Sequence, residues 1–204
     1  MKKLDSDDVV IYKDCHIISQ ENLKKINDMK DNNFAQKFFN FYNGHTFNGD
    51  SFRKSKHFPY QYLRVELQNT IINLISEMDV ANKNKQELLN WSLTVIILLS
   101  LNQELVDLLQ NYDYGFKVPK IIIFHNDRET VDTYNSVLLH ILKYFGFDIL
   151  FFTPTGYCDI ENIYPENILN IFQLEECSQD FKFPFSKDNI IGEKLNFFER
   201  IFRK

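Results

Sequence analysis

The sequence predicts an α/β protein in which a helical N-terminal half packs on a small Rossmann-like parallel sheet in the C-terminal half. Two apolar runs, Ile121–Phe124 and Phe147–Phe152, are typical of strands that are covered on both faces. Between them, an apolar stripe at helical spacing runs from Val131 to Phe145 and stops at Gly146, a residue suited to a helix C-terminus. Strand, helix and strand within about 35 residues predict a βαβ unit with parallel strands and a right-handed crossover.

Helices are expected through most of the chain before this unit. A helix capped by a serine is expected over residues 19–29. A second helix follows Pro59 and carries an apolar stripe with a period near 3.6 residues. A third, from about Lys85, is apolar on nearly every side, so we expect it to be buried and either to continue or to bend near Asn102.

The segment between the first two helices lacks a clear period. Residues 32–57 contain many aromatic residues, two Asn-Gly turn signals and a cluster of basic residues. We therefore expect residues 1–58 to form a helical and irregular N-terminal segment. Residues 59–204 are expected to form a domain that contains helices and the Rossmann-like α/β unit.

Two strands are too few for a stable parallel sheet, so more strands are needed. The candidates within the chain are the segments DVVIYK (Asp8–Lys13) and NIFQLEE (Asn170–Glu176). Another chain or a lost N-terminal segment is the alternative source.

Composition narrows the class of protein. The chain has 204 residues with a net charge of −5, which argues against a dedicated nucleic-acid binder. Its three cysteines are an odd number without metal-ligand spacing, so neither a disulfide framework nor a metal site is expected. The N-terminus lacks a signal peptide, and the longest apolar stretch is about half of a bilayer span. We expect a cytoplasmic protein without a transmembrane segment.

Ligands of open α/β sheets bind beyond the carboxyl ends of the strands, where two loops of this chain are expected. Small hydroxyl and glycine residues let backbone N–H groups approach an anion, and the N-terminus of a helix starting near Asn126 adds partial positive charge. The alternative is an ordinary turn and an N-cap. The candidate ligand-binding residues are Thr153, Thr155, Gly156, Tyr157, His125 and Asn126.

Catalytic candidates are fewer. Asp159 and Glu161 follow the second loop, where two carboxylates suit a general base or a metal, although acids also favour the start of a helix. Neither loop has the three-glycine dinucleotide fingerprint, and the chain has no Walker A sequence. A standard NAD or FAD site is therefore not expected. The identity of any cofactor and the existence of catalysis both stay open.

A basic cluster lies in the irregular segment and just after it. Its residues alternate with His57, Tyr60 and Tyr62, a composition that suits phosphate binding or stacking on a base. The alternative is a solvated loop whose aromatic residues cover the helices. The cluster consists of Arg53, Lys54, Lys56 and Arg64.

Residues from about 50 onward resemble a known family. The segment HFPYQYLRVELQNTIINLI, the βαβ unit with PTGYCDIE after its second strand, and the closing FPFSKDN and FFERIFRK are similar to the C-terminal part of the YceG-like family. Its members are bacterial proteins described as components of a biosynthetic module linked to tellurite-resistance genes. The resemblance implies a tellurite or stress response, but it brings no catalytic residue, and residues 1–50 are not matched.

These observations lead to one preferred hypothesis and two alternatives. The preferred function is that of an accessory component of a tellurite-resistance-linked module that binds a small anionic or nucleotide-like ligand at the Thr153–Tyr157 loop. The first alternative is a transferase acting on a nucleotide or sugar-nucleotide through Asp159 or Glu161. The second is a non-catalytic structural subunit that pairs through an open sheet edge. Other proteins of the same module are expected partners.

Overall fold

The computed structural model describes residues 9–13, 16–43, 46–83, 91–111, 118–125 and 131–153. Within these ranges the chain forms two compact units. The sheet unit contains the described residues of 9–17, 118–132 and 146–153. The helical unit contains those of 18–111 and 133–145. The domain boundary expected at residue 58 stays a prediction.

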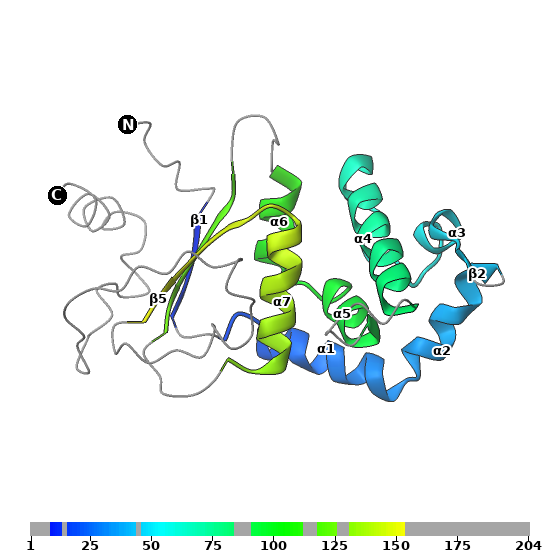
Figure 1. The fold of residues 1–204 in the computed structure, drawn as a ribbon, viewed down its shortest axis with the longest axis horizontal. Coiled ribbons are helices and arrows are strands. Elements are labelled where there is room, and N and C mark those ends of the chain that lie inside the picture. Colours follow the sequence, from blue (N-terminus) through cyan, green and yellow to red (C-terminus); the bar gives the residue numbers. More distant parts are fainter. Residues whose placement is uncertain are drawn as a thin grey trace. The chain divides into compact units, whose positions relative to one another are not determined.

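Most elements of the two units are labelled in Figure 1. The sheet unit has three strands, which are β1 (Val9–Lys13), β4 (Lys120–Phe124) and β5 (Asp148–Phe152). The first part of the helical unit contains α1 (Gln20–Asp31), α2 (Phe34–Phe38), the 3-10 helix η2 (Phe39–Phe41), β2 (Tyr42–Asn43), β3 (Thr46–Phe47) and α3 (Gly49–Arg53). The rest of the helical unit contains α4 (Val65–Lys83), α5 (Trp91–Leu98), α6 (Gln103–Asn111) and α7 (Thr133–Tyr144).

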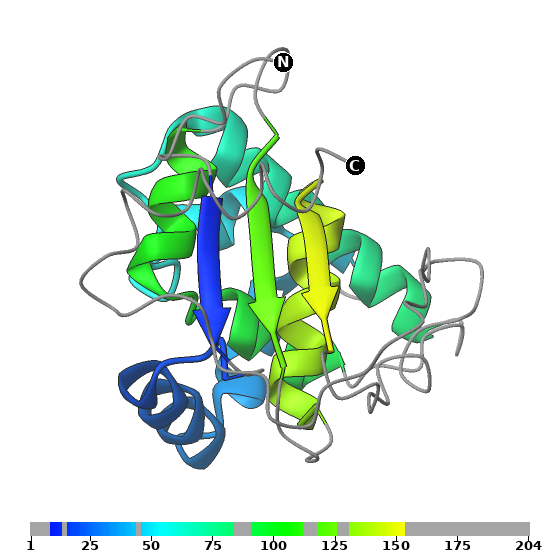
Figure 2. The same cartoon turned by 90° about the vertical axis from the view of Figure 1, so that its left-hand side faces the viewer.

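The three strands of the sheet unit run parallel in the order β1-β4-β5, side by side in Figure 2. Four consecutive residues of the central strand, Ile121–Phe124, are buried, as a continuous apolar run predicts for a covered strand. The parallel pairing of β4 with β5 confirms the predicted pairing of the βαβ unit. The expectation that β5 is covered on both faces was wrong, because its residues are exposed or half-buried. Of the two candidate strands, Asp8–Lys13 is confirmed as β1, and Asn170–Glu176 lies outside the described residues.

This sheet takes a strand from the N-terminus, so it is not built from the C-terminal half alone. The protein is thus a mixed helix-and-strand protein with a three-stranded parallel sheet in its described part. The finer expectation of a Rossmann-like arrangement stays a prediction.

Three polar side chains fix the start of α1. The Ser19 hydroxyl accepts a hydrogen bond from the Asn22 N–H (3.2 Å), which confirms the predicted N-cap. The Asn102 Oδ1, between α5 and α6, accepts from the Asn22 side chain (2.6 Å) and from the Ser19 N–H (3.2 Å). Because Asn22 is 5% exposed, its amide needs such a partner. This network joins α1 to the α5–α6 connection.

The connection between α5 and α6 is a sharp bend of 78° near Asn102, which decides between the two expectations for this stretch. No single helix among the described residues has the length and apolar character to cross a membrane. The bent pair of α5 and α6 meets that test only when the two helices are taken together.

The described residues of the segment 32–57, which the sequence left without a period, contribute to a lobe of packed rings. Phe38 lies at its centre and is 1% exposed. Its ring centroid lies between 4.8 and 6.2 Å from those of Phe34, Phe41, Tyr42, Phe47, Phe52 and Trp91. Aromatic packing therefore takes the place of a regular helix or strand pattern in this segment.

The two Asn-Gly signals of this lobe have different outcomes. Asn43 ends β2, which pairs antiparallel with β3, so the first signal lies at a hairpin connection as expected. At the second, Asn48 caps α3, because its side-chain oxygen accepts a hydrogen bond from the Ser51 N–H (3.0 Å). The second signal therefore begins a helix, and Gly49 is the first helical residue.

Gly49→Ala is expected to destabilise the helical unit by about 1–3 kcal/mol, because a β-carbon at this position would overlap the Cγ2 methyl of Ile72 on α4. Urea unfolding followed by the fluorescence of Trp91, the single tryptophan, measures the loss. Ile72→Ala removes the overlapping methyl, so the two substitutions together should cost less than the sum of the single costs. Strict additivity would contradict this close approach of α3 and α4.

Helix α7 is shorter than predicted. It begins at Thr133, whereas the sequence placed its start near Asn126. Residues Val131 and Asp132 are not helical, so a continuous helix from Asn126 was wrong; residues 126–130 themselves lie outside the described residues. The predicted stop is confirmed, because Gly146 has a φ of 81°, which glycine adopts without strain.

His140, in the middle of α7, is half-buried, and burial lowers its pKa below the usual value of 6.5, with the charge of Lys143 adding to the effect. The unfolded chain therefore takes up a proton at His140 at a higher pH than the folded chain does. The resulting contribution to the free energy of unfolding is fully present above about pH 6.5 and is lost as pH falls through the folded pKa.

We expect His140→Gln to flatten the pH dependence of stability. Urea midpoints measured by Trp91 fluorescence from about pH 7.5 down to about pH 5.5 should fall less steeply in this variant than in the native chain, because glutamine does not titrate there. Equal slopes for the two proteins would show that His140 does not contribute.

Candidate functional site

The carboxyl ends of all three strands lie in register at one edge of the sheet unit. Lys13, the last residue of β1, pairs with Phe124 of β4, and Phe124 pairs with Phe152 of β5. The next residues along the chain, His125 and Thr153, are therefore neighbours. The His125 N–H donates a hydrogen bond to the Phe152 carbonyl (2.9 Å), which extends the parallel pairing by one step. The two predicted ligand loops thus begin side by side.

Aromatic rings support the histidine at this edge. The rings of Phe124 and Phe152 stack with centroids 5.0 Å apart. The centroid of the His125 ring lies 5.6 Å from that of the Phe151 ring, and His125 is 3% exposed. A buried imidazole is held in position by such packing, so its nitrogen atoms present a fixed set of donor and acceptor positions.

Of the other residues predicted to bind a ligand or to act in catalysis, the structure describes Thr153. Thr153 is half-buried and directly follows β5, as expected. The remaining predicted residues lie outside the described residues, and their roles stay predictions; these are Asn126, Thr155, Gly156, Tyr157, Asp159 and Glu161. The described part of the chain contains no group of three or more His, Cys, Asp or Glu residues arranged to hold a metal ion.

One residue at this edge was not singled out from the sequence. Lys13 closes β1 at the carboxyl end, next in register to the residue before His125. A basic residue type at this position is of interest because the expected ligand is anionic. The available signal was the segment DVVIYK, which predicts a strand ending in lysine, but its place in the sheet depends on pairing with a strand more than 100 residues away.

The opposite edge of the sheet has a different character. There the ammonium group of Lys120 lies 3.9 Å from the Asp148 carboxylate and donates to the Val118 carbonyl (2.9 Å). Both charges are partly exposed, so the pair adds little stability. It provides a useful reference position for experiments, because it is on the same sheet but at the amino ends of the strands.

The basic cluster belongs to the helical unit, and its arginines hold the structure together. Arg53 donates to Asn69 (2.8 Å) and to the Asp50 carboxylate (2.9 Å). Arg64 donates to the Leu109 carbonyl (3.2 Å) near the end of α6, where a cation favours the helix dipole. Lys54 and Lys56 are exposed. The cluster therefore contains two structural arginines and two surface lysines.

Comparison with known proteins identifies the family. A model of the YceG domain matches residues 5–192. The chain belongs to the YceG family. The match includes residues 5–50, which lie in the part for which the sequence had shown no resemblance. No solved structure matches the chain.

A curated relative gives a shorter match. A Bacillus subtilis (strain 168) protein named "Uncharacterized protein YceG" is 31% identical over 88 residues. These residues make up 42% of this chain and 16% of the relative, so the chain corresponds to a small part of that protein.

Proposed function

We propose that this YceG-family chain is an accessory component of a biosynthetic module associated with tellurite resistance and stress. In this role it binds a small anionic or nucleotide-like ligand beyond the carboxyl ends of its parallel strands, at the Thr153–Tyr157 loop. The observation that supports the ligand site is the adjacency of His125 and Thr153. Parallel sheets bring the loops that follow neighbouring strands together at this edge, which is where ligands of such sheets bind.

The ligand proposal is tested by a thermal-shift screen of nucleotides, sugar-nucleotides and other phosphorylated metabolites. A ligand that binds only the folded chain should stabilise it by about 2.7 kcal/mol when present at about 100 times its Kd. Gly156→Leu should abolish the stabilisation, because a large side chain would block the approach of an anion to the backbone. Lys120→Ala, at the opposite edge of the sheet, should keep it.

The same ligand separates binding from catalysis. Alanine at Asp159 or Glu161 should leave the stabilisation intact if the chain is a binding component, whereas a transferase would lose turnover in these variants. If no phosphorylated metabolite raises the melting temperature, or if Lys120→Ala removes the effect as fully as Gly156→Leu, the proposed site is refuted.

The structural-subunit alternative is favoured by a separate observation. In the described part of the chain, β1 and β5 each pair with one strand only, so each has an edge on which another strand can be added. Light scattering of the purified chain tests this function. The N–H of Ile149 faces away from β4, because those of Asp148 and Leu150 face it. A stable dimer or larger assembly that dissociates when proline is introduced into β5 at Ile149 would support this function, and a monomer over a wide concentration range would exclude self-pairing.

A further inference from the structure

Residues 32–64 of this acidic protein carry a net positive charge. The whole chain has a net charge of −5, whereas residues 32–64 contain five basic residues and one acidic residue. The basic residues are Lys37, Arg53, Lys54, Lys56 and Arg64, and the acidic residue is Asp50. The protein as a whole is negatively charged and disfavours polyanions, but this segment has a positive local charge that attracts them.

The lysines carry the charge that is free to act at the surface. Arg53 is paired with Asp50, and Arg64 bonds to the carbonyl end of α6. Lys37, Lys54 and Lys56 are exposed. Among the residues that the structure describes, no acidic side chain forms an ion pair with any of these three lysines.

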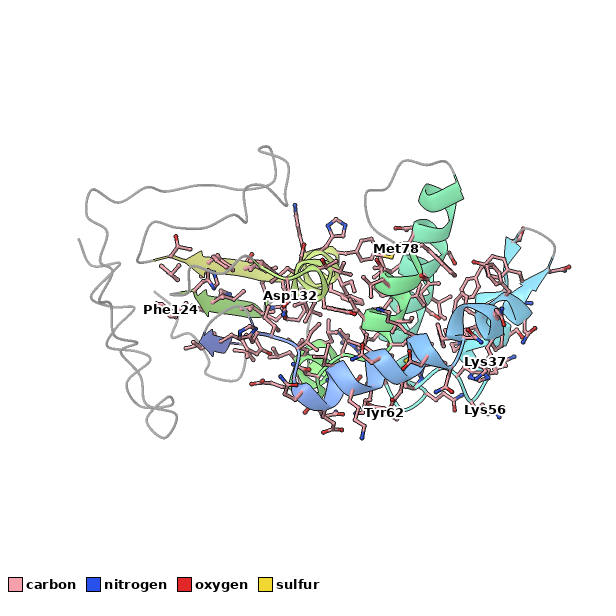
Figure 3. The ribbon with its side chains drawn as sticks, turned by 90° about the horizontal axis from the view of Figure 1, so that it is seen from below. Lys37, Lys56, Tyr62, Met78, Phe124 and Asp132 are labelled. Carbon is pink, nitrogen blue, oxygen red and sulfur yellow. The ribbon has the colours of Figure 1, made fainter. Side chains whose placement is uncertain are left out.

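Packing between η2 and the turn after α3 brings the lysines to one surface. The Phe41 and His57 rings pack edge to face, with their centroids 6.0 Å apart. Lys37 precedes Phe41 by one helical turn, and Lys56 is the neighbour of His57. Figure 3 shows Lys37 and Lys56 at the same end of the helical unit. The two chain segments therefore contribute to one basic face.

Aromatic side chains belong to the same two chain segments as the lysines or directly follow them. Phe41 and His57 are half-buried, and Tyr62 is 62% exposed. The Gln61 amide donates to the carbonyls of Arg53 (3.3 Å) and Ser55 (2.7 Å), which holds the neighbouring Tyr62 beside the lysine-bearing turn. The exposed face of the Tyr62 ring is accessible to a ligand.

We propose that this basic face, formed by Lys37, Lys54, Lys56, Phe41, His57 and Tyr62, binds single-stranded nucleic acid. The lysines contact phosphates, and Tyr62 stacks on a base. Lysines that alternate with accessible rings along irregular backbone are the pattern with which proteins hold unpaired strands without sequence preference. An acidic peptide would use the lysines but not the ring, so the aromatic component favours a polynucleotide. The site lies in the helical unit and does not depend on the ligand proposed for the sheet unit.

Fluorescence anisotropy of the full chain with a labelled oligouridine of about 12 nucleotides tests the proposal. Three phosphate contacts predict a Kd of about 1–100 μM, and affinity should fall about 20-fold between about 50 and about 200 mM salt. Lys37→Glu with Lys56→Glu should weaken binding about tenfold or more and make the salt dependence shallower. Tyr62→Ser should weaken it about fivefold or more, and Tyr62→Phe should retain it.

The matched control reverses two exposed lysines outside the basic face, Lys24 on α1 and Lys143 on α7. The double variant Lys24→Glu, Lys143→Glu changes the net charge by the same amount as Lys37→Glu with Lys56→Glu. It should alter the affinity by less than about twofold, because salt screens charges that lie far from the bound strand. Circular dichroism and urea unfolding of each variant confirm that the fold is retained. A loss of affinity confined to the basic-face variants supports the proposal.

Other results overturn it. Absence of saturable binding at about 50 mM salt would exclude a polynucleotide site, as would equal losses in the two charge-reversal variants. Uridine monophosphate binding as tightly as the oligomer would mean a small-molecule site, and oligoglutamate binding as tightly would mean a surface for acidic proteins. Unchanged affinity in Tyr62→Ser would remove the stacking contact and with it the reason to prefer nucleic acid.

Discussion

Phe38→Ala is expected to destabilise the helical unit by about 3–5 kcal/mol, the largest effect that we predict for a single substitution. The ring is 1% exposed, and rings from α2, η2, β2, β3, α3 and α5 surround it. Removing it leaves a cavity that is shared by all these elements, and neighbouring rings are too rigid to fill such a cavity by small shifts. Urea unfolding followed by circular dichroism gives the change in the free energy of unfolding.

The adjacent residue provides the control. Phe39 has the same side chain but is 59% exposed, and its nearest ring neighbours are Tyr42 at 5.7 Å and Trp91 at 6.5 Å. Phe39→Ala should cost less than about 1 kcal/mol, because little apolar surface is buried there. Similar costs for Phe38→Ala and Phe39→Ala would mean that the aromatic lobe is not centred on Phe38.

Tyr60→Phe is expected to have the second largest effect. Removing this one hydroxyl oxygen should lower the free energy of unfolding by about 2–4 kcal/mol. The Tyr60 hydroxyl donates to the Leu98 carbonyl (2.9 Å) and accepts from the Leu101 N–H (3.0 Å), both at the bend between α5 and α6. All three groups are buried, and phenylalanine would leave one backbone donor and one backbone acceptor there without this partner. Each such group costs about 1–3 kcal/mol.

The pH dependence of this effect follows from the tyrosine pKa. Burial raises the pKa of Tyr60 far above its usual value of 10.0, although the hydrogen bond from Leu101 acts in the opposite direction. The hydroxyl therefore stays protonated and keeps donating to Leu98 throughout the neutral and mildly alkaline range. The cost of Tyr60→Phe should be the same at about pH 6.5 and about pH 8.5.

Tyr62→Phe is the matched control for Tyr60→Phe, since Tyr62 is 62% exposed and two positions further along the chain. It should change stability by less than about 0.5 kcal/mol. If Tyr60→Phe were equally harmless, the α5–α6 bend would not depend on the hydroxyl, and its 78° angle would have to arise from apolar packing alone.

The parts of the fold that are local in sequence could be predicted. The apolar runs of β4 and β5, the cap at Ser19 and the stop at Gly146 each depend on residues that are close along the chain. In each case one strong interaction, such as burial of a strand or capping of a helix, dominates the local energy. Such a signal can be recognised within a window of about ten residues around it.

The parts that depend on distant contacts could not be predicted. The pairing of β1 with β4, which places Lys13 beside the ligand loops, joins segments more than 100 residues apart. The aromatic lobe has no periodic pattern, since rings pack edge to face in many arrangements of similar energy. At Asn48 the same Asn-Gly pair that suits a turn caps α3, and a β-carbon at Gly49 would overlap Ile72 on α4, a neighbour more than 20 residues away in sequence.

For the candidate sites, the residue types could be chosen from the sequence, but which residues lie next to one another was known only from the structure. His125 and Thr153 were chosen because each follows an expected strand, and their adjacency depended on the parallel pairing of β4 with β5. In the basic cluster the sequence did not distinguish its members. Arg53 and Arg64 bond to neighbouring elements, whereas Lys54 and Lys56 face solvent, and only contacts in the folded chain separate these roles.

The ligand site at the carboxyl edge of the sheet is tested most directly by two-dimensional amide NMR of the chain, titrated with the best metabolite from the thermal-shift screen. We expect the amide signals of Lys13, His125 and Thr153 to shift with ligand concentration. Those of Lys120 and Asp148, at the amino ends of the same strands, should stay in place. Shifts at Lys120 and Asp148 with none at His125 and Thr153 would contradict the proposed site.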